Sequence, residues 1–109
     1  TKEKLDILRE ADEVFISELK NRRLYDRIWQ AFCVLLDQAS VGIKDGRRSY
    51  CRTVAIRAVN SNDATKADVY PFEFKDLLDI ARAISSSVPE IGRVVYDISG
   101  KPPATIEWE

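Results

Sequence analysis

The segment from Tyr50 to Val59 constrains the fold more than any other part of this 109-residue chain. It is rich in Val, Ile, Thr and Tyr, the residues that pack well in strands. A turn signal, Lys44-Asp45-Gly46, comes shortly before it. The segment therefore predicts a strand, and any fold considered for the chain has to include a sheet.

Three other segments carry apolar residues at the spacing of a helix. They are residues 3–20, residues 23–38 and residues 72–86, the last following Pro71. The apolar positions of the second segment are Leu24, Ile28, Phe32 and Leu35. We expect all three segments to be helices, with Phe32 and Leu35 largely buried.

Alternating patterns near the C-terminus predict a hairpin of residues 93–98 and 104–109 around a turn at residues 99–103. A short strand is expected at residues 67–70. The resulting order is α-α-β-β-α-β-β. It indicates an α+β fold in which helices cover an antiparallel sheet of about four strands. The length fits one domain over residues 1–109.

The chain contains no histidine, which limits its chemistry. Histidine is the usual general base near neutral pH and the commonest metal ligand. Its absence excludes Ser-His-Asp and Cys-His nucleophile systems and mixed Cys/His zinc sites. We expect a protein that is not an enzyme, with no catalytic residues, no cofactor and no metal, and an enzyme that uses only carboxylates, Lys and Arg is the alternative.

The two cysteines, Cys33 and Cys51, lie in an apolar and in a strand-like context. We expect both to be buried free thiols of a cytoplasmic protein, and a single disulfide in an exported protein is the alternative. No apolar run approaches the length of a membrane-spanning helix, and no signal peptide is visible.

Charge is distributed unevenly along the chain, although its net value is only −1. Residues 44–67 carry a basic strip, and an aromatic residue, Tyr50, lies within it. The strip consists of Lys44, Arg47, Arg48, Arg52 and Arg57. A nucleic-acid-binding module that uses residues 44–57 is one hypothesis. An edge strand protected by its charges is the other.

Acidic residues dominate the last third of the chain, where residues 68–109 hold eight acidic and four basic side chains. Asp76 and Asp79 are three positions apart on the third predicted helix, and Glu107 and Glu109 flank Trp108. These four acidic residues are the candidate partner-binding residues. A solvated helix surface is the simpler explanation for the two aspartates.

The C-terminal two fifths of the chain resemble a known family. Residues 92–101, Gly-Arg-Val-Val-Tyr-Asp-Ile-Ser-Gly-Lys, are followed by Thr105-Ile106-Glu107-Trp108-Glu109. This pattern resembles the YezG-like, contact-dependent growth-inhibition type of bacterial immunity protein. The resemblance implies a non-catalytic antitoxin whose partner is a cognate toxin domain, for example a nuclease. Separately, the net charge of −1 predicts no membrane partner and makes nucleic acid an unfavoured one, and the oligomeric state is left open.

Overall fold

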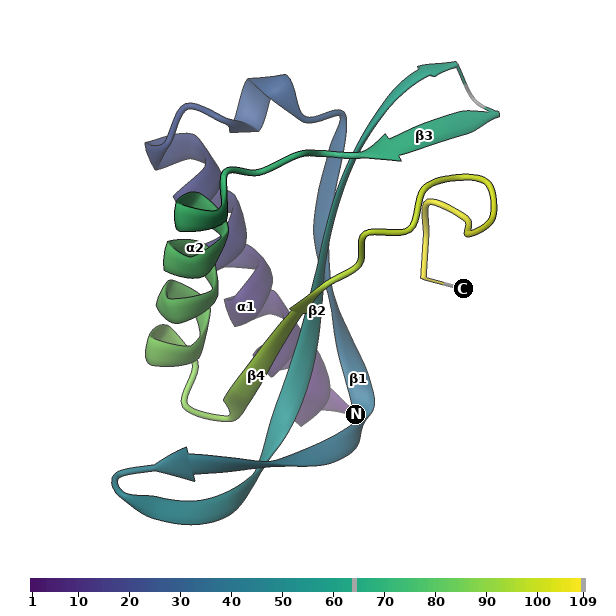
Figure 1. Ribbon diagram of the computed structural model, residues 1–109. Coiled ribbons are helices and arrows are strands. Elements are labelled where there is room, and N and C mark those ends of the chain that lie inside the picture. Colours follow the sequence, from purple (N-terminus) through teal and green to yellow (C-terminus); the bar gives the residue numbers. More distant parts are fainter. Residues whose placement is uncertain (64, 109) are drawn as a thin grey trace.

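Two helices cover one side of a four-stranded sheet in the computed structural model, which describes residues 1–63 and 65–108 (Figure 1). In chain order the elements are α1 (Lys2–Asn21), the 3-10 turn η1 (Tyr25–Arg27), β1 (Gln30–Lys44), β2 (Arg47–Asp63), β3 (Lys66–Val69), α2 (Phe74–Ser87) and β4 (Ile91–Tyr96). The expected fold class, α+β with about four strands and a helical cover, is confirmed.

Strand β2 is the centre of the sheet, because every other strand pairs with it. β1 and β3 run antiparallel to β2, as expected, whereas β4 runs parallel to it, so the sheet is not antiparallel throughout. Asp45 and Gly46 form the two-residue turn between β1 and β2, with φ angles of 53° and 75°. Turns of this kind need positive φ at both positions, which an Asp-Gly pair tolerates well. The turn signal therefore marks the hairpin correctly.

The hydrophobic core lies between the helices and the sheet. α1 contributes one residue per turn, namely Ile7, Ala11, Phe15 and Leu19, all buried. Ile80 and Ile84 of α2 join the same cluster, together with Val54, Ile56 and Ala58 of β2. The helices predicted at residues 3–20 and 72–86 are thus confirmed within two residues at each end. Neither helix of the described chain has both the length and the apolar character needed to cross a membrane.

The helix predicted over residues 23–38 is wrong. The structure places η1 and then β1 in this range. Residues 31–36 are apolar on both faces of β1, so they do not alternate with polar residues. A short run of this kind cannot be distinguished from a helix by periodicity. Phe32 and Leu35 are only partly buried and lie at the margins of the core.

The hairpin predicted at the C-terminus is also wrong. Residues 93–96 belong to β4, which pairs with β2 rather than with residues 104–108. The expected turn contains Pro102 and Pro103, which have no backbone N–H for a strand ladder. Instead of turning back along β4, the chain after Tyr96 crosses to the side of the sheet that the helices leave open (Figure 1).

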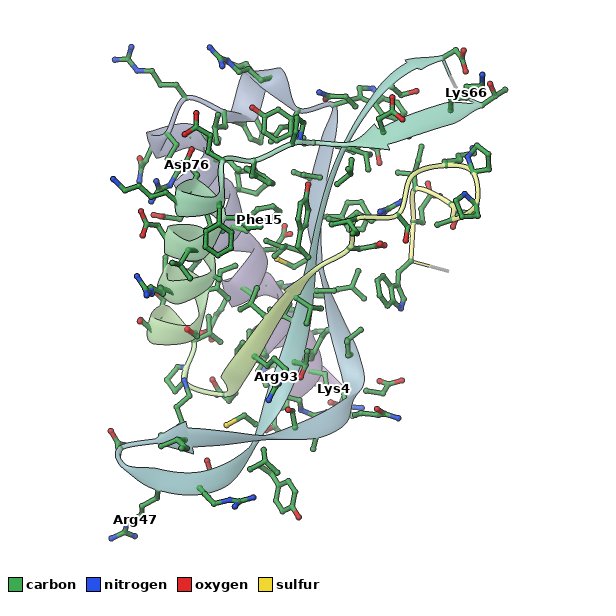
Figure 2. The ribbon with its side chains drawn as sticks, in the orientation of Figure 1. Lys4, Phe15, Arg47, Lys66, Asp76 and Arg93 are labelled. Atoms are coloured by element: carbon green, nitrogen blue, oxygen red, sulfur yellow. The ribbon has the colours of Figure 1, made fainter. Side chains whose placement is uncertain are left out.

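The β1–β2 hairpin continues past the helices as an arm, residues 40–51. Figure 2 shows Arg47 at its tip, pointing away from the rest of the chain. Lys44 connects the arm to α2, because its Nζ donates a hydrogen bond to the carbonyl oxygen of Ser85 at 3.0 Å. Ile43 and Tyr50 are exposed on the arm, at 71% and 82% of their surface.

Three strands approach one another closely where the arm begins. Cys51 of β2 lies between Gly42 of β1 and Gly92 of β4. A Cβ at Gly92 would lie only 2.6 Å from Cβ and 2.8 Å from Sγ of Cys51. A Cβ at Gly42 would lie 3.0 Å from the same sulfur. A side chain at Gly92 would therefore force the crossing to shift, and one at Gly42 would need the Cys51 sulfur to give way slightly.

Both cysteines are buried free thiols, as expected. Burial raises the pKa of the Cys33 thiol, and the nearby Asp12 carboxylate raises this pKa further. Oδ1 of Asp12 also accepts a hydrogen bond from the Cys33 backbone N–H at 3.0 Å. Cys33 is therefore held in its neutral, unreactive form.

Truncating Phe15 tests the core assignment. Phe15→Ala is expected to lower the free energy of unfolding by about 3–5 kcal/mol, because it removes a fully buried ring. Phe74→Ala is the matched control, since Phe74 is 75% exposed, and it should change stability far less. Chemical denaturation followed by circular dichroism measures both. Equal losses in the two variants would contradict the packing described here.

The thiols provide a second test. In the native chain neither cysteine should react with a chromogenic disulfide reagent, because both are buried and the pKa of Cys33 is raised. Two thiols per chain should titrate once the protein is denatured. Rapid reaction of either cysteine before unfolding would show that the sheet does not enclose it.

Candidate functional site

A buried arginine lies in the middle of the central strand. Arg57 is fully buried, between Ile56 and Ala58, whose side chains face the helices. Because side chains alternate along a strand, Arg57 points to the opposite face of the sheet. That face is covered by residues 97–108, which we call the C-terminal tail (Figure 1). A buried charge needs paired and hydrogen-bonded surroundings, and the tail provides them.

Four oxygen atoms of the tail surround the Arg57 guanidinium. Nε donates to the carbonyl oxygen of Ile106 at 2.6 Å, and Nη2 donates to that of Thr105 at 2.7 Å. Nη1 donates to the carbonyl oxygen of Ser99 at 2.7 Å and lies 3.0 Å from Oδ2 of Asp97. The planar guanidinium carries its donors in a fixed fork, which suits such a ring of acceptors. Arg57 thus joins the beginning of the tail to its end.

The tail is also attached to the sheet at its turn. The backbones of Lys101 and Ala67 exchange two hydrogen bonds, of 2.8 Å and 3.1 Å, so that the turn lies along β3. Ile106 is buried in a small cluster with Val59 and Ala67, and Phe32 packs against this cluster. These contacts and the guanidinium give an irregular segment a defined position.

The attached tail presents an acidic side chain and an aromatic ring to solvent. Glu107 is exposed, and Trp108 is 46% exposed. Trp108 borders a hollow of about 360 Å³ between α1 and β1. The other lining residues are Thr1, Lys4, Leu5, Leu8, Cys33, Val34 and Leu35. A loop fixed on a rigid scaffold with exposed polar groups is the usual setting for ligand binding.

The predicted partner-binding residues Asp76 and Asp79 lie in the first half of α2, and Figure 2 shows Asp76 near the end of α1. Arg22 donates to Oδ1 of Asp76 at 3.0 Å, and its Nη2 lies 3.7 Å from Oδ2 of Asp79. Glu18 also pairs with Arg22, at 3.2 Å. These ion pairs join the two helices. Carboxylates already matched by an arginine contribute less charge to an external interface.

Glu107 is far from the two aspartates, because the tail and α2 lie on opposite sides of the sheet (Figure 1). Glu109 lies outside the described residues. The three described acidic residues therefore do not form one face. Contact of these residues with a partner stays a prediction. In the described part of the chain, no group of three or more carboxylates and thiols is placed to hold a metal ion.

The basic strip predicted at residues 44–57 is divided by the structure. Three residues of the strip, Lys44, Arg47 and Arg48, lie on the arm, whereas Arg57 is enclosed by the tail. Sequence reasoning thus missed the residue on which the tail depends. The available signal was a single charge inside an apolar strand, Ala-Ile-Arg57-Ala-Val, because charged residues are almost never fully buried unless they are paired.

Removing the guanidinium tests the described geometry. Arg57→Met is expected to lower the free energy of unfolding by about 3–5 kcal/mol, because it leaves a carboxylate and three carbonyl groups without their donor. Arg48→Met is the matched control on the same strand. Arg48 is exposed, so this change should stay within about 0.5 kcal/mol. Denaturant unfolding measures both, and a small effect at Arg57 would contradict a paired, buried charge.

Comparison with known proteins gives consistent matches. The family model described as GMP synthase C terminal domain matches residues 17–108. The glutamine-hydrolysing GMP synthase of Bdellovibrio bacteriovorus is 55% identical over the whole chain, and that of Thermotoga petrophila is 53% identical. The enzyme of the same name from Symbiobacterium thermophilum is 51% identical. The chain covers 21–22% of the length of these relatives.

These matches overturn the functional hypothesis drawn from the sequence. The resemblance to immunity proteins is wrong, because it rested on a turn motif in two fifths of the chain, whereas the new matches cover nearly all of it. The antitoxin function, the toxin partner, the nucleic-acid alternative and the expectation of a protein that is not an enzyme are wrong for the same reason. The chain belongs to the GMP synthase C-terminal domain family.

Proposed function

We propose that this chain is the C-terminal domain of a longer, glutamine-hydrolysing GMP synthase and takes part in forming GMP. The observation that carries this proposal is identity of 50–55% to enzymes of that name along the chain. Residues 1–109 would act as a single domain of that protein, and its location would be cytoplasmic.

Within such an enzyme, this chain is better suited to positioning a ligand than to hydrolysing glutamine. Hydrolysis of an amide needs an activated nucleophile and a base. The chain has no histidine, and both of its thiols are buried, one of them with a raised pKa. We therefore assign glutamine hydrolysis to the part of the enzyme outside these residues.

The C-terminal tail is the segment of this domain that we assign to contact with the nucleotide. It has a fixed backbone, held at both ends by Arg57, and it exposes the charged side chain of Glu107. Binding of a ligand costs less when the contacting loop is already ordered. Arg47, by contrast, lies at the tip of the arm and points away from the rest of the chain (Figure 2).

Complementation tests the proposed function. A gene for the full-length protein that carries this chain should restore growth without guanine to a bacterium that lacks its own GMP synthase. A version lacking residues 99–109 should fail to do so, because the tail is absent. Arg47→Ala, at the tip of the arm, is the control and should complement.

Binding of GMP to the purified full-length proteins, measured by calorimetry, distinguishes loss of the tail from loss of the protein. Wild type and Arg47→Ala should bind the nucleotide, and the shortened protein should not. Failure of the wild-type gene to complement, in cells that accumulate the protein, would refute the assignment as a GMP synthase.

A further inference from the structure

The tail has little regular structure of its own. Among the described residues it makes one isolated bridge, between Lys101 and Ala67, and no strand. We call the segments before and after the turn, residues 97–100 and 104–108, the two limbs of the tail. In an ordinary hairpin, ladder hydrogen bonds between two strands would hold such limbs together. Here the carbonyl groups of Ser99, on the first limb, and of Thr105 and Ile106, on the second, all accept from one guanidinium. Apart from one backbone hydrogen bond at the turn, from the Ala104 N–H to the Gly100 carbonyl oxygen at 3.0 Å, a single side chain replaces the missing ladder.

Two side chains of the tail lie very close in the sequence to these anchored carbonyl groups. Glu107 comes immediately after Ile106, and Lys101 comes two residues after Ser99. With so few bonds between anchor and side chain, a shift of the anchored carbonyls moves both side chains. Arg57 itself is fully buried beneath the tail, so it has no direct access to a ligand in solution.

No other side chain can make the same set of contacts. The three carbonyl groups receive Nε, Nη1 and Nη2, which are three different nitrogen atoms of one plane. A lysine at this position would keep the positive charge but has a single nitrogen on a flexible stem. It would leave at least part of the ring of acceptors unpaired, at a buried position where unpaired groups are costly.

We propose that Arg57 is a positioning residue of the nucleotide site: it holds both limbs of the C-terminal tail in the arrangement that binds GMP, without touching GMP itself. This inference rests on the proposed function, in which the tail contacts the nucleotide. Without the guanidinium the two limbs separate, and the binding arrangement becomes one of several. If it is then populated about one tenth of the time, the apparent dissociation constant for GMP rises about tenfold.

The test compares Arg57→Lys with wild type in the full-length protein, using hydrogen exchange read by mass spectrometry and calorimetric titration with GMP. Peptides that cover residues 97–107 should exchange faster in the variant, while peptides from α1 and α2 keep their protection. The dissociation constant for GMP should rise about tenfold. Arg48→Lys, the same substitution at an exposed position of β2, is the matched control and should change neither quantity.

A second variant covers the case in which Arg57→Lys does not fold and exchanges rapidly throughout. Asp97→Asn removes the charge that pairs with Arg57 at 3.0 Å and leaves the three carbonyl contacts in place. It should shift tail exchange and GMP affinity in the same directions by smaller amounts, with the helices still protected.

Each remaining outcome identifies which idea fails. A wild-type protein that does not bind GMP overturns the proposed function and this inference with it. A wild-type protein that binds GMP, with variants whose tails exchange faster at unchanged affinity, overturns only the positioning role. Unchanged tail exchange in both folded variants shows that Arg57 does not hold the tail, and this also overturns the inference.

Discussion

The structure depends on a central strand that is buried on both faces. β2 carries the hydrogen bonds of all three other strands, so each of them takes its position from it. One face of β2 packs on α1 and α2 through Val54, Ile56 and Ala58. The other face carries Val59 and the Arg57 charge, and the described residues form no third α-helix that covers it. The tail covers that face instead, attached by the Arg57 guanidinium together with the buried Ile106 side chain.

Much of the fold follows from local patterns in the sequence. The two helices were predictable because one face of each packs against the sheet and the other meets solvent, which produces a clear helical period. The turn before β2 was predictable because Asp45 and Gly46 tolerate positive φ. β1 was not, since both of its faces are partly buried and residues 31–36 lost the alternation that identifies a strand.

The candidate site was predictable only in part. The acidic residues chosen from the sequence include Asp76 and Asp79, which the structure uses to join α1 and α2 through Arg22. The contacts that shape the tail were invisible because the acceptors are mostly backbone carbonyls, 42 to 49 residues away from Arg57. Every residue type carries such a group, so no motif marks it. The family was recognised by similarity along nearly the whole chain rather than by any local signature.

The close approach of three strands around Cys51 limits how this part of the chain can diverge. Because the sulfur fills the space left by two missing side chains, positions 42, 51 and 92 are exchangeable only as a set. A side chain at Gly92 forces β4 away from β2 unless Cys51 shrinks at the same time, and one at Gly42 presses on the Cys51 sulfur. Substitutions at this crossing should therefore compensate one another, and positions 42, 51 and 92 should covary among relatives although they are far apart in the sequence.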